Sequence, residues 1–417
     1  MPNQNQRGNT NHQLGLLSAG SAVSFVIMIG LVSLFADTTY EGGRSLIGQY
    51  LKLLGSNATV VGFVAGAGSL LGYSLRLASG YIADKTQKYW LVALIGYVIN
   101  LFSLPMLAFV GQWEVAVIFI FLERIGKAIR NPSRDAMLSY ATHKMGRGWG
   151  FGVHEAMDQI GSVLGPLLMA GVLSWRGTGP ADVGRYQFSF KMLFISAVVA
   201  MIVLVAARFL FPNPKELEDP TPEVAVSGFD SSFWWYMGAI GLIGLGFAEF
   251  PLMAFHFKTI DLAPDAAIPV FYAIGMAVDG VAALVFGKLY DRHGLPVLIG
   301  VFGAAAFFAP LAFLGTRNIA VLGVALWGVG MGAAESILRV PIAEMVSRER
   351  RAQAYGTYHF ALGVSLFAGG ALIGWLYDQD LIPVLVIFSV LIQLAALPIL
   401  WRAGRRDRSS KSPGMSS

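Results

Sequence analysis

The sequence predicts an all-α membrane protein with about twelve transmembrane helices in two pseudo-symmetric six-helix bundles, and three observations support this prediction. Of the 417 residues, 55% are hydrophobic and 13% are charged, a balance outside the range of soluble proteins. The apolar runs are each roughly 20 residues long, which lets a helix cross a hydrocarbon core of ~30 Å. A charged motif also occurs twice, at corresponding places in the two halves of the chain.

The apolar runs form two sets on either side of a polar break. We expect transmembrane helices at residues 17–37, 57–83, 89–110, 112–130, 150–175 and 188–211, and then at 232–256, 267–290, 296–315, 318–338, 355–378 and 380–402. These runs are continuous and do not alternate between apolar and polar residues, which argues against the strands of a β-barrel.

The polar break begins at Pro212 with the residues PNPKELEDPTPE and has no apolar periodicity, as expected of a flexible linker. The first residues are rich in Asn, Gln and Gly, and lack the compact apolar region and cleavage site of a signal peptide. The predicted organisation is a cytoplasmic tail at 1–16, a six-helix bundle at 17–211, a cytoplasmic linker at 212–231, a second six-helix bundle at 232–402 and a cytoplasmic tail at 403–417.

Lysine and arginine lie mainly on one side of the predicted membrane. If the amino terminus is cytoplasmic, the cytoplasmic connections and the carboxyl-terminal tail hold most of these residues, and the other side has only scattered charges. The cytoplasmic set comprises Lys85, Lys88, Arg130, Arg134, Lys144, Arg147, Lys288, Arg292, Arg339, Arg348, Arg350, Arg351, Arg402, Arg405, Arg406, Arg408 and Lys411. This excess predicts cytoplasmic termini and an integral protein of a bacterial inner membrane.

Several function classes are disfavoured by composition and motifs. The net charge of +5 is explained by membrane topology, so we expect no nucleic-acid partner. The chain has no cysteine, hence no disulfide framework, and no pair of histidines has metal-ligand spacing. There is no GxxxxGK[ST] phosphate loop and no Ser-His-Asp grouping in a recognisable elbow. We therefore expect neither a metal nor a cofactor, and no enzyme.

The repeated motif is a charged hairpin between two apolar runs. It consists of Gly80, Asp84 and Lys85 in the first half and of Gly287, Asp291 and Arg292 in the second. A second repeat follows the fourth and tenth apolar runs, where arginine, proline and an acid recur at the same offsets. It consists of Arg130, Pro132 and Asp135, and of Arg339, Pro341 and Glu344. We expect both prolines to end a transmembrane helix and the charges to begin a cytoplasmic amphipathic one.

With these motifs the chain resembles the major facilitator superfamily of secondary transporters. The resemblance rests on GxxxD[KR] between helices two and three and again between helices eight and nine, and it extends over residues 17–402. The sequence departs from the family pattern at Gln87, where a glycine is usual, and at Leu295 and Pro296, where basic residues are usual.

The fifth apolar run resembles the antiporter signature of that family, GxxxGP, with Gly161, Gly165 and Pro166. The two glycines predict a close helix crossing and the proline predicts a bend. The same pair also fits ordinary helix packing, because Gly370 and Gly374 stand at the corresponding places in the second half.

The repeated hairpins are predicted to act as a cytoplasmic latch. Asp84 could bind a helix amino terminus across the interface of the halves, or pair with Arg130 or Arg134. Asp291 has Arg339 as its symmetry-related partner. The alternative is that these loop charges are solvated and only set topology.

Charges inside the helices indicate where function lies, because each costs at least a few kcal/mol at the bilayer centre unless it meets water or a partner. They lie on the helices that, by resemblance to the major facilitator superfamily, line the central cavity. In that family helices three, six, nine and twelve are peripheral. The interior set comprises Asp37, Glu41, Arg76, Glu123, Arg124, Glu155, Asp158, Glu249, Asp279, Glu335 and His359.

Asp279 is near the middle of its run, and we expect it to be the principal proton carrier. The alternative is a neutral, hydrogen-bonded aspartate that ties helices together. Asp158 is a second candidate, with Arg76 or Arg124 as its switchable partner or as a static buried partner.

Asp37 and Glu41 are four residues apart on one helix face, with Arg44 one turn further. They could form an external gate for protons or substrate, or a plain surface cluster of ion pairs. With Glu249 they are further candidates for proton coupling. Glu249 lies two residues before Pro251, which marks a helix break suited to gating or binding. Glu123, Glu335 and His359 are assigned to packing and to snorkelling at the helix ends.

These observations predict a monomeric secondary transporter in the lipid bilayer. It would move a small organic compound by alternating access, with proton-coupled efflux as the first hypothesis and metabolite uptake by symport or uniport as the second. A membrane receptor that does not transport is the alternative outside transport.

Overall fold

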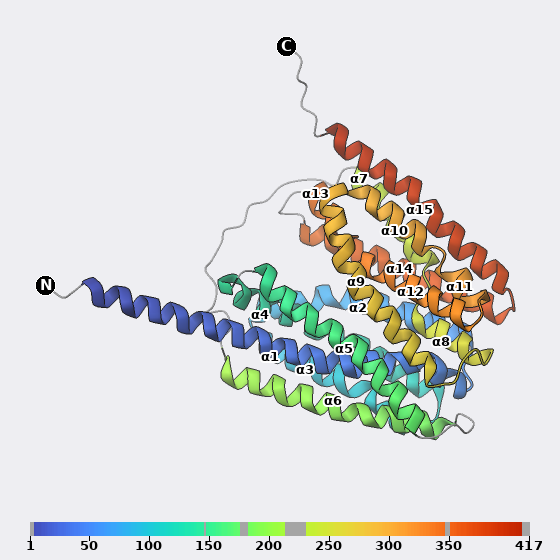
Figure 1. The fold of residues 1–417 in the computed structure, drawn as a ribbon, viewed down its shortest axis with the longest axis horizontal. Helices are drawn as coiled ribbons and strands as arrows, with labels where there is room; N and C mark the ends of the chain where they lie inside the picture. The colour runs from blue at the N-terminus through green and yellow to red at the C-terminus, as the bar shows by residue number, and fades with distance from the viewer. Residues whose placement is uncertain (1–3, 146, 176–181, 213–230, 347–350, 411–417) are drawn as a thin grey trace, which may run out of the picture.

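The computed structural model describes residues 4–145, 147–175, 182–212, 231–346 and 351–410, and within these ranges the chain is helical without any strand (Figure 1). The first half contains α1 (Gln4–Leu53), α2 (Ala58–Thr86), α3 (Tyr89–Ser103), the 3₁₀ helix η1 (Pro105–Phe109), α4 (Trp113–Met145), α5 (Arg147–Trp175) and α6 (Val183–Leu210). The second half contains α7 (Ser231–Gly246), α8 (Phe250–Thr259), α9 (Ala267–His293), α10 (Leu295–Ala305), α11 (Phe308–Leu314), α12 (Arg317–Ser336), α13 (Val340–Met345), α14 (Arg351–Asp378) and α15 (Ile382–Ser410).

These elements make about twelve membrane crossings, which confirms the predicted fold class. Four crossings consist of two consecutive pieces, namely α3 with η1, α7 with α8, α10 with α11, and α12 with α13. In the described part of the chain, 11 helical spans are long and apolar enough to cross a membrane. The remaining crossing is α4, whose interior charges lower its apolar average. The predicted linker, apart from its end residues, lies outside the described residues.

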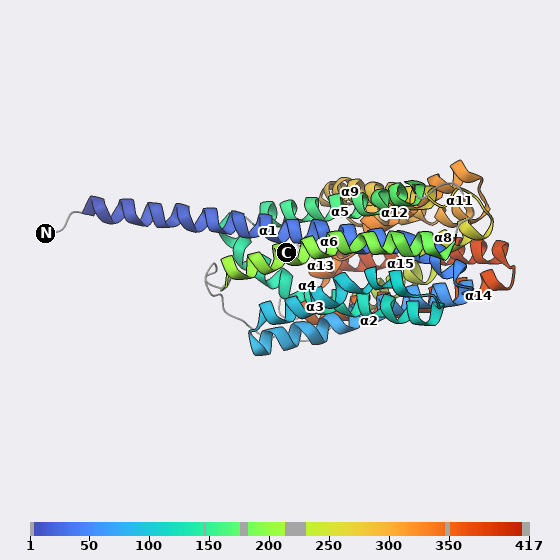
Figure 2. The same ribbon diagram turned by 90° about the horizontal axis from the view of Figure 1, so that it is seen from below.

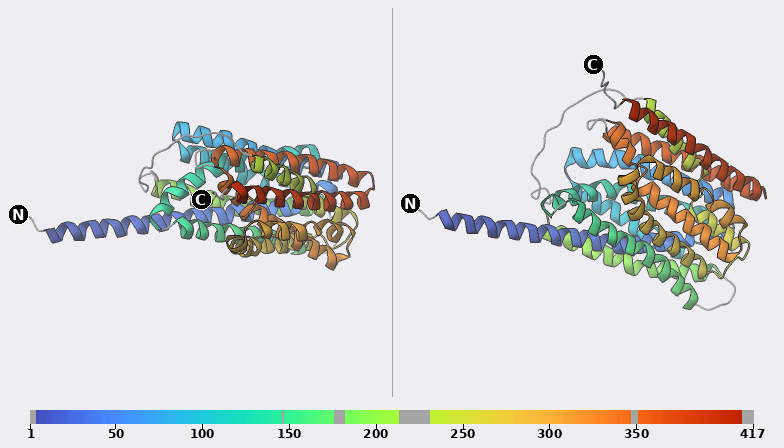
Figure 3. Two further views of the ribbon diagram at one scale, coloured as in Figure 1. Left: turned by 90° about the horizontal axis from the view of Figure 1, so that it is seen from above. Right: turned by 45° about the horizontal axis from the view of Figure 1, so that its top comes forward.

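The crossings run side by side with both chain ends toward one face, which we call the termini face; we call the other the opposite face. The termini-side part of α1 extends beyond the bundle (Figures 2 and 3). The two halves approach each other near α8 and α11 and diverge toward the termini face (Figure 1). The molecule is therefore fan-shaped, with its narrow end at the opposite face.

The prediction that Pro132 ends a helix is wrong, because α4 continues through it to Met145. A proline in a helix leaves the carbonyl four residues earlier without its usual amide partner. Here that carbonyl, of Ala128, accepts a 2.8 Å hydrogen bond from the hydroxyl of Ser79 on α2. In the second half α12 ends at Ser336, before the proline, and Pro341 lies in the first turn of α13, which continues the same crossing.

The break between α7 and α8 is held open by side chains of neighbouring helices. The carbonyl of Gly246 accepts hydrogen bonds from Ser389 (2.7 Å) and Gln393 (3.0 Å) of α15. The carbonyl of Ala248 accepts a 3.0 Å bond from the indole of Trp327 on α12. Because backbone groups in a membrane must find partners inside the protein, these bonds make the break a stable feature.

Glycines set the close crossings within the first half. A Cβ on Gly96 of α3 would lie 2.8 Å from both Cα and Cβ of Arg130 on α4. On α5, Gly161 and Gly165 face the backbone of α1 at Leu34 and Thr38. The GxxxGP motif therefore forms the α1–α5 crossing, and α5 continues through Pro166.

We predict that Gly96→Ala destabilises the protein by about 1–3 kcal/mol, because the added methyl overlaps the backbone of α4. The measurement is the thermal midpoint Tm in detergent. Gly300→Ala is the matched control, since Gly300 also lies inside a helix and its Cβ would meet open space. Equal Tm values for the two variants would contradict the packing argument.

Candidate functional site

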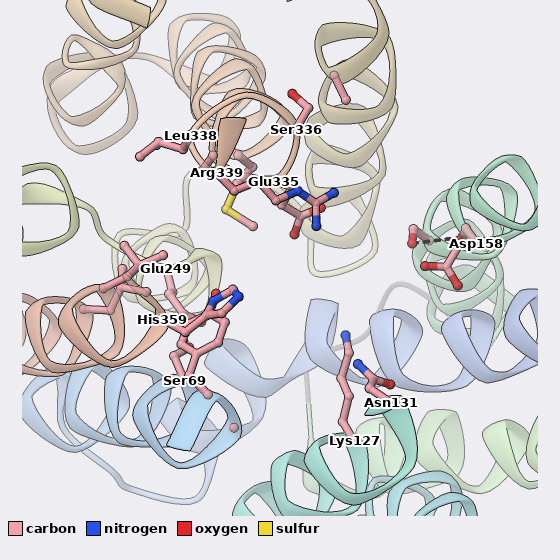
Figure 4. Close-up of a pocket in the computed structure, with 18 of the residues that line it drawn as sticks. Ser69, Lys127, Asn131, Asp158, Glu249, Glu335, Ser336, Leu338, Arg339 and His359 are labelled. Atoms are coloured by element: carbon pink, nitrogen blue, oxygen red, sulfur yellow. Dashed lines mark hydrogen bonds between the residues drawn. The ribbon is translucent and has the colours of Figure 1, made fainter. Parts of the chain in front are cut away.

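A cavity of about 800 Å³ lies between the two halves (Figure 4). Its walls come from α1, α2, α4 and α5 on one side and from α7, α9, α12 and α14 on the other. Among the described residues, none of α3, α6 or α15 lines it, and α10 contributes Phe302 alone. The charged inner helices therefore surround the cavity.

Charged side chains of both signs line this cavity. The acidic ones are Asp37, Glu41, Glu155, Asp158, Glu249 and Glu335. The basic ones are Arg44, Arg76, Arg124, Lys127, Arg130, Arg134 and Arg339. The two sets nearly balance in charge, so what a ligand would meet depends on which of them are already paired.

The cavity is closed toward the opposite face by contacts between the halves. Gly62 of α2 faces Gly370 of α14, and Gly48 of α1 faces Pro251 of α8, so closely that a Cβ on any of these glycines would overlap the partner's backbone. Toward the termini face the helices of the two halves diverge (Figure 1), and Glu335 in the cavity wall is exposed.

Glu249 lies at the closed end of the cavity, in the break between α7 and α8. Its Oε2 atom is 2.6 Å from Nη2 of Arg44 and 3.5 Å from Nη2 of Arg124. Its Oε1 atom accepts a 2.5 Å hydrogen bond from the hydroxyl of Ser69. These partners come from α1, α4 and α2, so one side chain of the second half joins three helices of the first. Two guanidinium groups compensate for the burial of the carboxylate.

Glu41 joins the same cluster and does not pair with Asp37. Its Oε1 atom is 3.8 Å from Nη1 of Arg44, and its Oε2 accepts a hydrogen bond from the hydroxyl of Tyr272 on α9. The two acids share a face of α1, as predicted, but lie one turn apart in depth, so different helices reach them.

Asp37 lies beside Asp158 between α1 and α5. The two carboxyl groups interact, and Oδ1 of Asp37 is 3.8 Å from Nη2 of Arg130. Asp37 is 1% exposed, and neither of its oxygens has a hydrogen-bond partner in the described part of the chain. A Cβ on Gly161, one turn after Asp158, would lie 3.0 Å from Cβ of Asp37. The glycine therefore allows the two acids to meet.

The partners predicted for Asp158 lie elsewhere. Arg124 contacts Glu249, and the guanidinium of Arg76 lies 5.5 Å from the ring centre of Tyr73. Arg134 is the arginine whose charge acts on Asp158. The difference arises because the arginines lie at different depths along α2 and α4.

Asp279 lies on α9 behind the cavity wall, which is lined one turn to either side of it by Met276 and Ala283. It is 1% exposed, and neither carboxyl oxygen has a hydrogen-bond partner among residues that the structure describes. Its backbone carbonyl packs against Gly332 of α12, and the next residue packs against Gln159 of α5. Asp279 is thus as deeply buried as Asp37, although it lies behind the wall and does not itself line the cavity.

Six charged residues of the cavity wall form no ion pair with another described residue. They are Arg76, Lys127, Glu155, Asp158, Glu335 and Arg339. Lys127 of the first half and Glu335 of the second face the cavity from opposite walls (Figure 4). The ammonium group of Lys127 is 3.7 Å from the ring centre of Tyr40.

An aromatic contact crosses the cavity between α2 and α14. The rings of Tyr73 and His359 stack with centroids 5.0 Å apart and an interplanar angle of 21°. The Nδ1 atom of His359 is buried without a hydrogen-bond partner among the described residues. This histidine, assigned to packing from the sequence, lines the cavity.

The predicted latch residues of the first hairpin do not meet in this conformation. Asp84 and Lys85 are exposed, and Oδ1 of Asp84 accepts a 2.9 Å hydrogen bond from the hydroxyl of Tyr89. Arg130 is buried inside α4, whereas Arg134 pairs with Asp135 at 2.8 Å. Both arginines belong to the wall of the cavity because α4 continues past Pro132.

The second hairpin is also open. Asp291 and Arg292 are exposed at the end of α9, and Arg339 lines the cavity without an ion pair to Asp291 in the described chain. Gly287 faces open space, whereas Gly80 lies beside Pro132 of α4.

Three important residues were missed by sequence reasoning, namely Ser69, Lys127 and Tyr272. A signal for Lys127 was present, because Glu123, Lys127, Arg130 and Arg134 follow the spacing of one helix face. For Ser69 and Tyr272 there was none, since a serine or tyrosine in an apolar run does not reveal its partner on another helix.

Comparison with known proteins identifies the family. The model of the Major Facilitator Superfamily matches residues 14–340. An uncharacterized protein of Mycobacterium tuberculosis strain H37Rv is 37% identical over 388 residues, which cover 91% of this chain and 93% of the relative. An uncharacterized MFS-type transporter of Methanocaldococcus jannaschii is 23% identical over 385 residues, covering 90% of this chain and 94% of the relative.

Solved structures share the fold. A mutant of the nucleoside transporter NupG has a TM-score of 0.73 at 16% identity, covering 90% of this chain and 99% of that one. A bacterial homolog of the human lysosomal transporter Spinster, in an inward-facing and unoccupied conformation, has a TM-score of 0.66 at 12% identity. The match covers 95% of this chain and 99% of that one. The family match and the shared fold together lead to one conclusion: the chain belongs to the major facilitator superfamily and is a secondary transporter.

Proposed function

We propose that this transporter exports a small, polar organic compound with charges of both signs, by alternating access and in exchange for protons. The observation that carries the proposal is the cavity between the halves, closed toward the opposite face and lined by acids and bases of both halves. Charged groups in a low-dielectric cavity favour polar ligands over lipophilic ones.

The residues without ion-pair partners define the compound's charges. Arg76 and Lys127 of the first half would bind an anionic group. Glu335 of the second half, which faces Lys127 across the cavity (Figure 4), would bind a cationic group. A compound with both groups would pair charges of both halves at once. Because an unpaired charge in the cavity is costly, this compound is favoured over one with a single charge.

Proton coupling is assigned to Asp37, Asp158 and Asp279. Asp37 and Asp158 adjoin each other in the cavity wall, and two neighbouring carboxyl groups favour sharing one proton. Asp279 has no hydrogen-bond partner among the described residues, so it is best accommodated with a proton. Glu41 and Glu249, which pair with arginines, act in gating between the halves.

The distribution of basic residues supports the proposal that the termini face lies on the cytoplasmic side of the membrane. Lys85, Lys88 and Arg292 are exposed there, as the excess of basic residues on the cytoplasmic side requires. The cavity, closed toward the opposite face, then receives its compound from the cytoplasm, which is the step that export needs. The monomer is the proposed unit, since one chain supplies the complete cavity, and a bacterial inner membrane is the proposed location.

The proposed proton carriers, Asp37, Asp158 and Asp279, are tested in proteoliposomes with an imposed pH gradient. We expect Asp37→Asn and Asp158→Asn each to lower compound-driven proton flux at least tenfold, and Asp279→Asn to abolish coupling while binding persists. The control is Glu114→Gln, which removes an exposed carboxylate outside the cavity. Unchanged proton flux in all three variants would refute this assignment.

The ligand charges are tested by thermal stabilisation of purified protein with three compounds of equal chain length: an α,ω-aminocarboxylate, a dicarboxylate and a diamine. We expect the aminocarboxylate to raise Tm most, and Lys127→Met to weaken its binding roughly ten- to a hundredfold through loss of a charged hydrogen bond. Glu335→Lys should shift preference toward the dicarboxylate.

Lys288→Met serves as the control for Lys127→Met, because Lys288 is exposed and does not line the cavity. A wild-type protein stabilised more by the dicarboxylate or the diamine would exclude the proposed compound class.

The orientation of the chain in the membrane and the direction of transport are tested in membrane vesicles. Because the chain has no cysteine, single cysteines can be introduced at exposed positions of the two faces, Lys88→Cys and Thr316→Cys. We expect an impermeant maleimide to label Lys88→Cys only in inverted vesicles and Thr316→Cys only in right-side-out vesicles.

For direction, energised inverted vesicles should accumulate the stabilising compound. Accumulation in right-side-out vesicles instead would replace export by uptake, whether by symport or by uniport.

A further inference from the structure

The last residue of α14 binds the first turn of α2 across the interface of the halves. Oδ1 of Asp378 accepts a 2.9 Å hydrogen bond from the amide of Ala58. Oδ2 accepts bonds from the amide of Thr59 (2.7 Å) and from its hydroxyl (2.5 Å). One carboxylate thus receives three hydrogen bonds at a helix amino terminus, where the helix dipole also favours a negative charge.

Helix α2 does not need this carboxylate in order to begin. Asn57 is already its N-cap, and its side chain accepts a 2.9 Å hydrogen bond from the amide of Val60. Asp378 occupies the remaining free amides of the first turn from the other half. The contact is therefore a link between the halves and not part of the local folding of α2.

This link lies at the outer end of the tightest seam between the halves. Helices α2 and α14 pack through Gly62 against Gly370, and Gly374 packs against the carbonyl of Ala58 beside the link. The seam cannot part at the opposite face while Asp378 holds the first turn of α2.

The other end of the same helix pair is different. Asp84, in the last turn of α2, lies at the termini face, where α14 begins at Arg351. Its carboxylate is exposed and bonded to Tyr89, and it has no hydrogen bond to α14 among the described residues. Among the described residues, the α2–α14 pair is thus joined by a carboxylate at its closed end only.

We propose that Asp378 is the latch of the opposite face: it holds the two halves together there, is released whenever that face opens, and sets how often the termini-open conformation is populated. The proposal rests on alternating access but is independent of proton coupling and of the transported compound. Asp84 is its counterpart at the far end of the seam, and its loss should act with the opposite sign.

The latch is tested by double electron–electron resonance on spin labels at two introduced cysteines. Gln112→Cys and Thr316→Cys lie exposed at the opposite face, one in each half. In wild type the short distance should predominate. Asp378→Asn should shift the equilibrium roughly tenfold toward the long distance, because it removes the charge and turns an amide group toward the helix N–H donors.

Two further variants make the result specific. Thr59→Val keeps the side-chain shape but deletes one donor, so it should produce a smaller shift of the same sign. Asp380→Asn removes an equal charge two residues away, at an exposed position whose φ of 57° asparagine tolerates, and should leave the distances unchanged.

Unchanged distances in Asp378→Asn, or an equal shift in Asp380→Asn, would overturn the latch. Either result would leave the proton-flux and ligand-binding assays unaffected, so failure of the latch and failure of the proposed function are separable.

Discussion

The pairing of Glu249 with two arginines is the interaction on which the arrangement of the halves depends. A buried carboxylate is tolerated only when its charge and lone pairs are compensated, and Arg44, Arg124 and Ser69 together do this. Glu249 is presented to them because the break before α8 is fixed by Trp327, Ser389 and Gln393 of its own half. A continuous seventh crossing would direct this side chain differently, and the arginines would lose their shared partner. The helix break and the closed end of the cavity are thus one structural feature.

Charges in the cavity differ systematically between its two ends. At the closed end Glu41, Arg44, Arg124 and Glu249 satisfy one another, whereas Lys127, Glu335 and Arg339 elsewhere in the wall have no ion-pair partner among the described residues. Paired charges hold helices together, and their desolvation is already compensated. Unpaired charges in a concave site between moving halves are instead available to a ligand. Whether a charge is paired therefore distinguishes residues that act in gating from residues that bind the ligand, and the side-chain type alone does not.

Sequence reasoning predicted the fold well, since the lengths of the apolar runs and the repeated hairpins are properties of the chain itself. It failed at Pro132, because the carbonyl freed by the proline finds its donor, Ser79, on another helix. The site shows the same limit. Spacing places Asp37 and Glu41 on one face of α1, but their partners Arg130 and Tyr272 are chosen by the packing of α4 and α9. Sequence reasoning therefore identified the interior acids one by one but did not predict which residues they pair with.

The glycine repeats show how a pseudo-symmetric sequence produces an asymmetric structure. Gly161 and Gly165 of α5 pack against α1 within the first half, whereas Gly370 and Gly374 of α14 pack against α2 of the other half. The first crossing stays within one half and can remain fixed while the halves move. The second lies on the moving interface, where backbone meets backbone at Gly62, Gly370 and Gly374 and ring contacts such as Phe63–Phe367 lie beside them. Backbone surfaces at these glycines offer little that is directional, so a polar contact at the end of the seam adds to what holds it closed. A carboxylate on a helix amino terminus is a contact of this kind: strong when aligned, and lost once the helix ends move apart by a few ångströms.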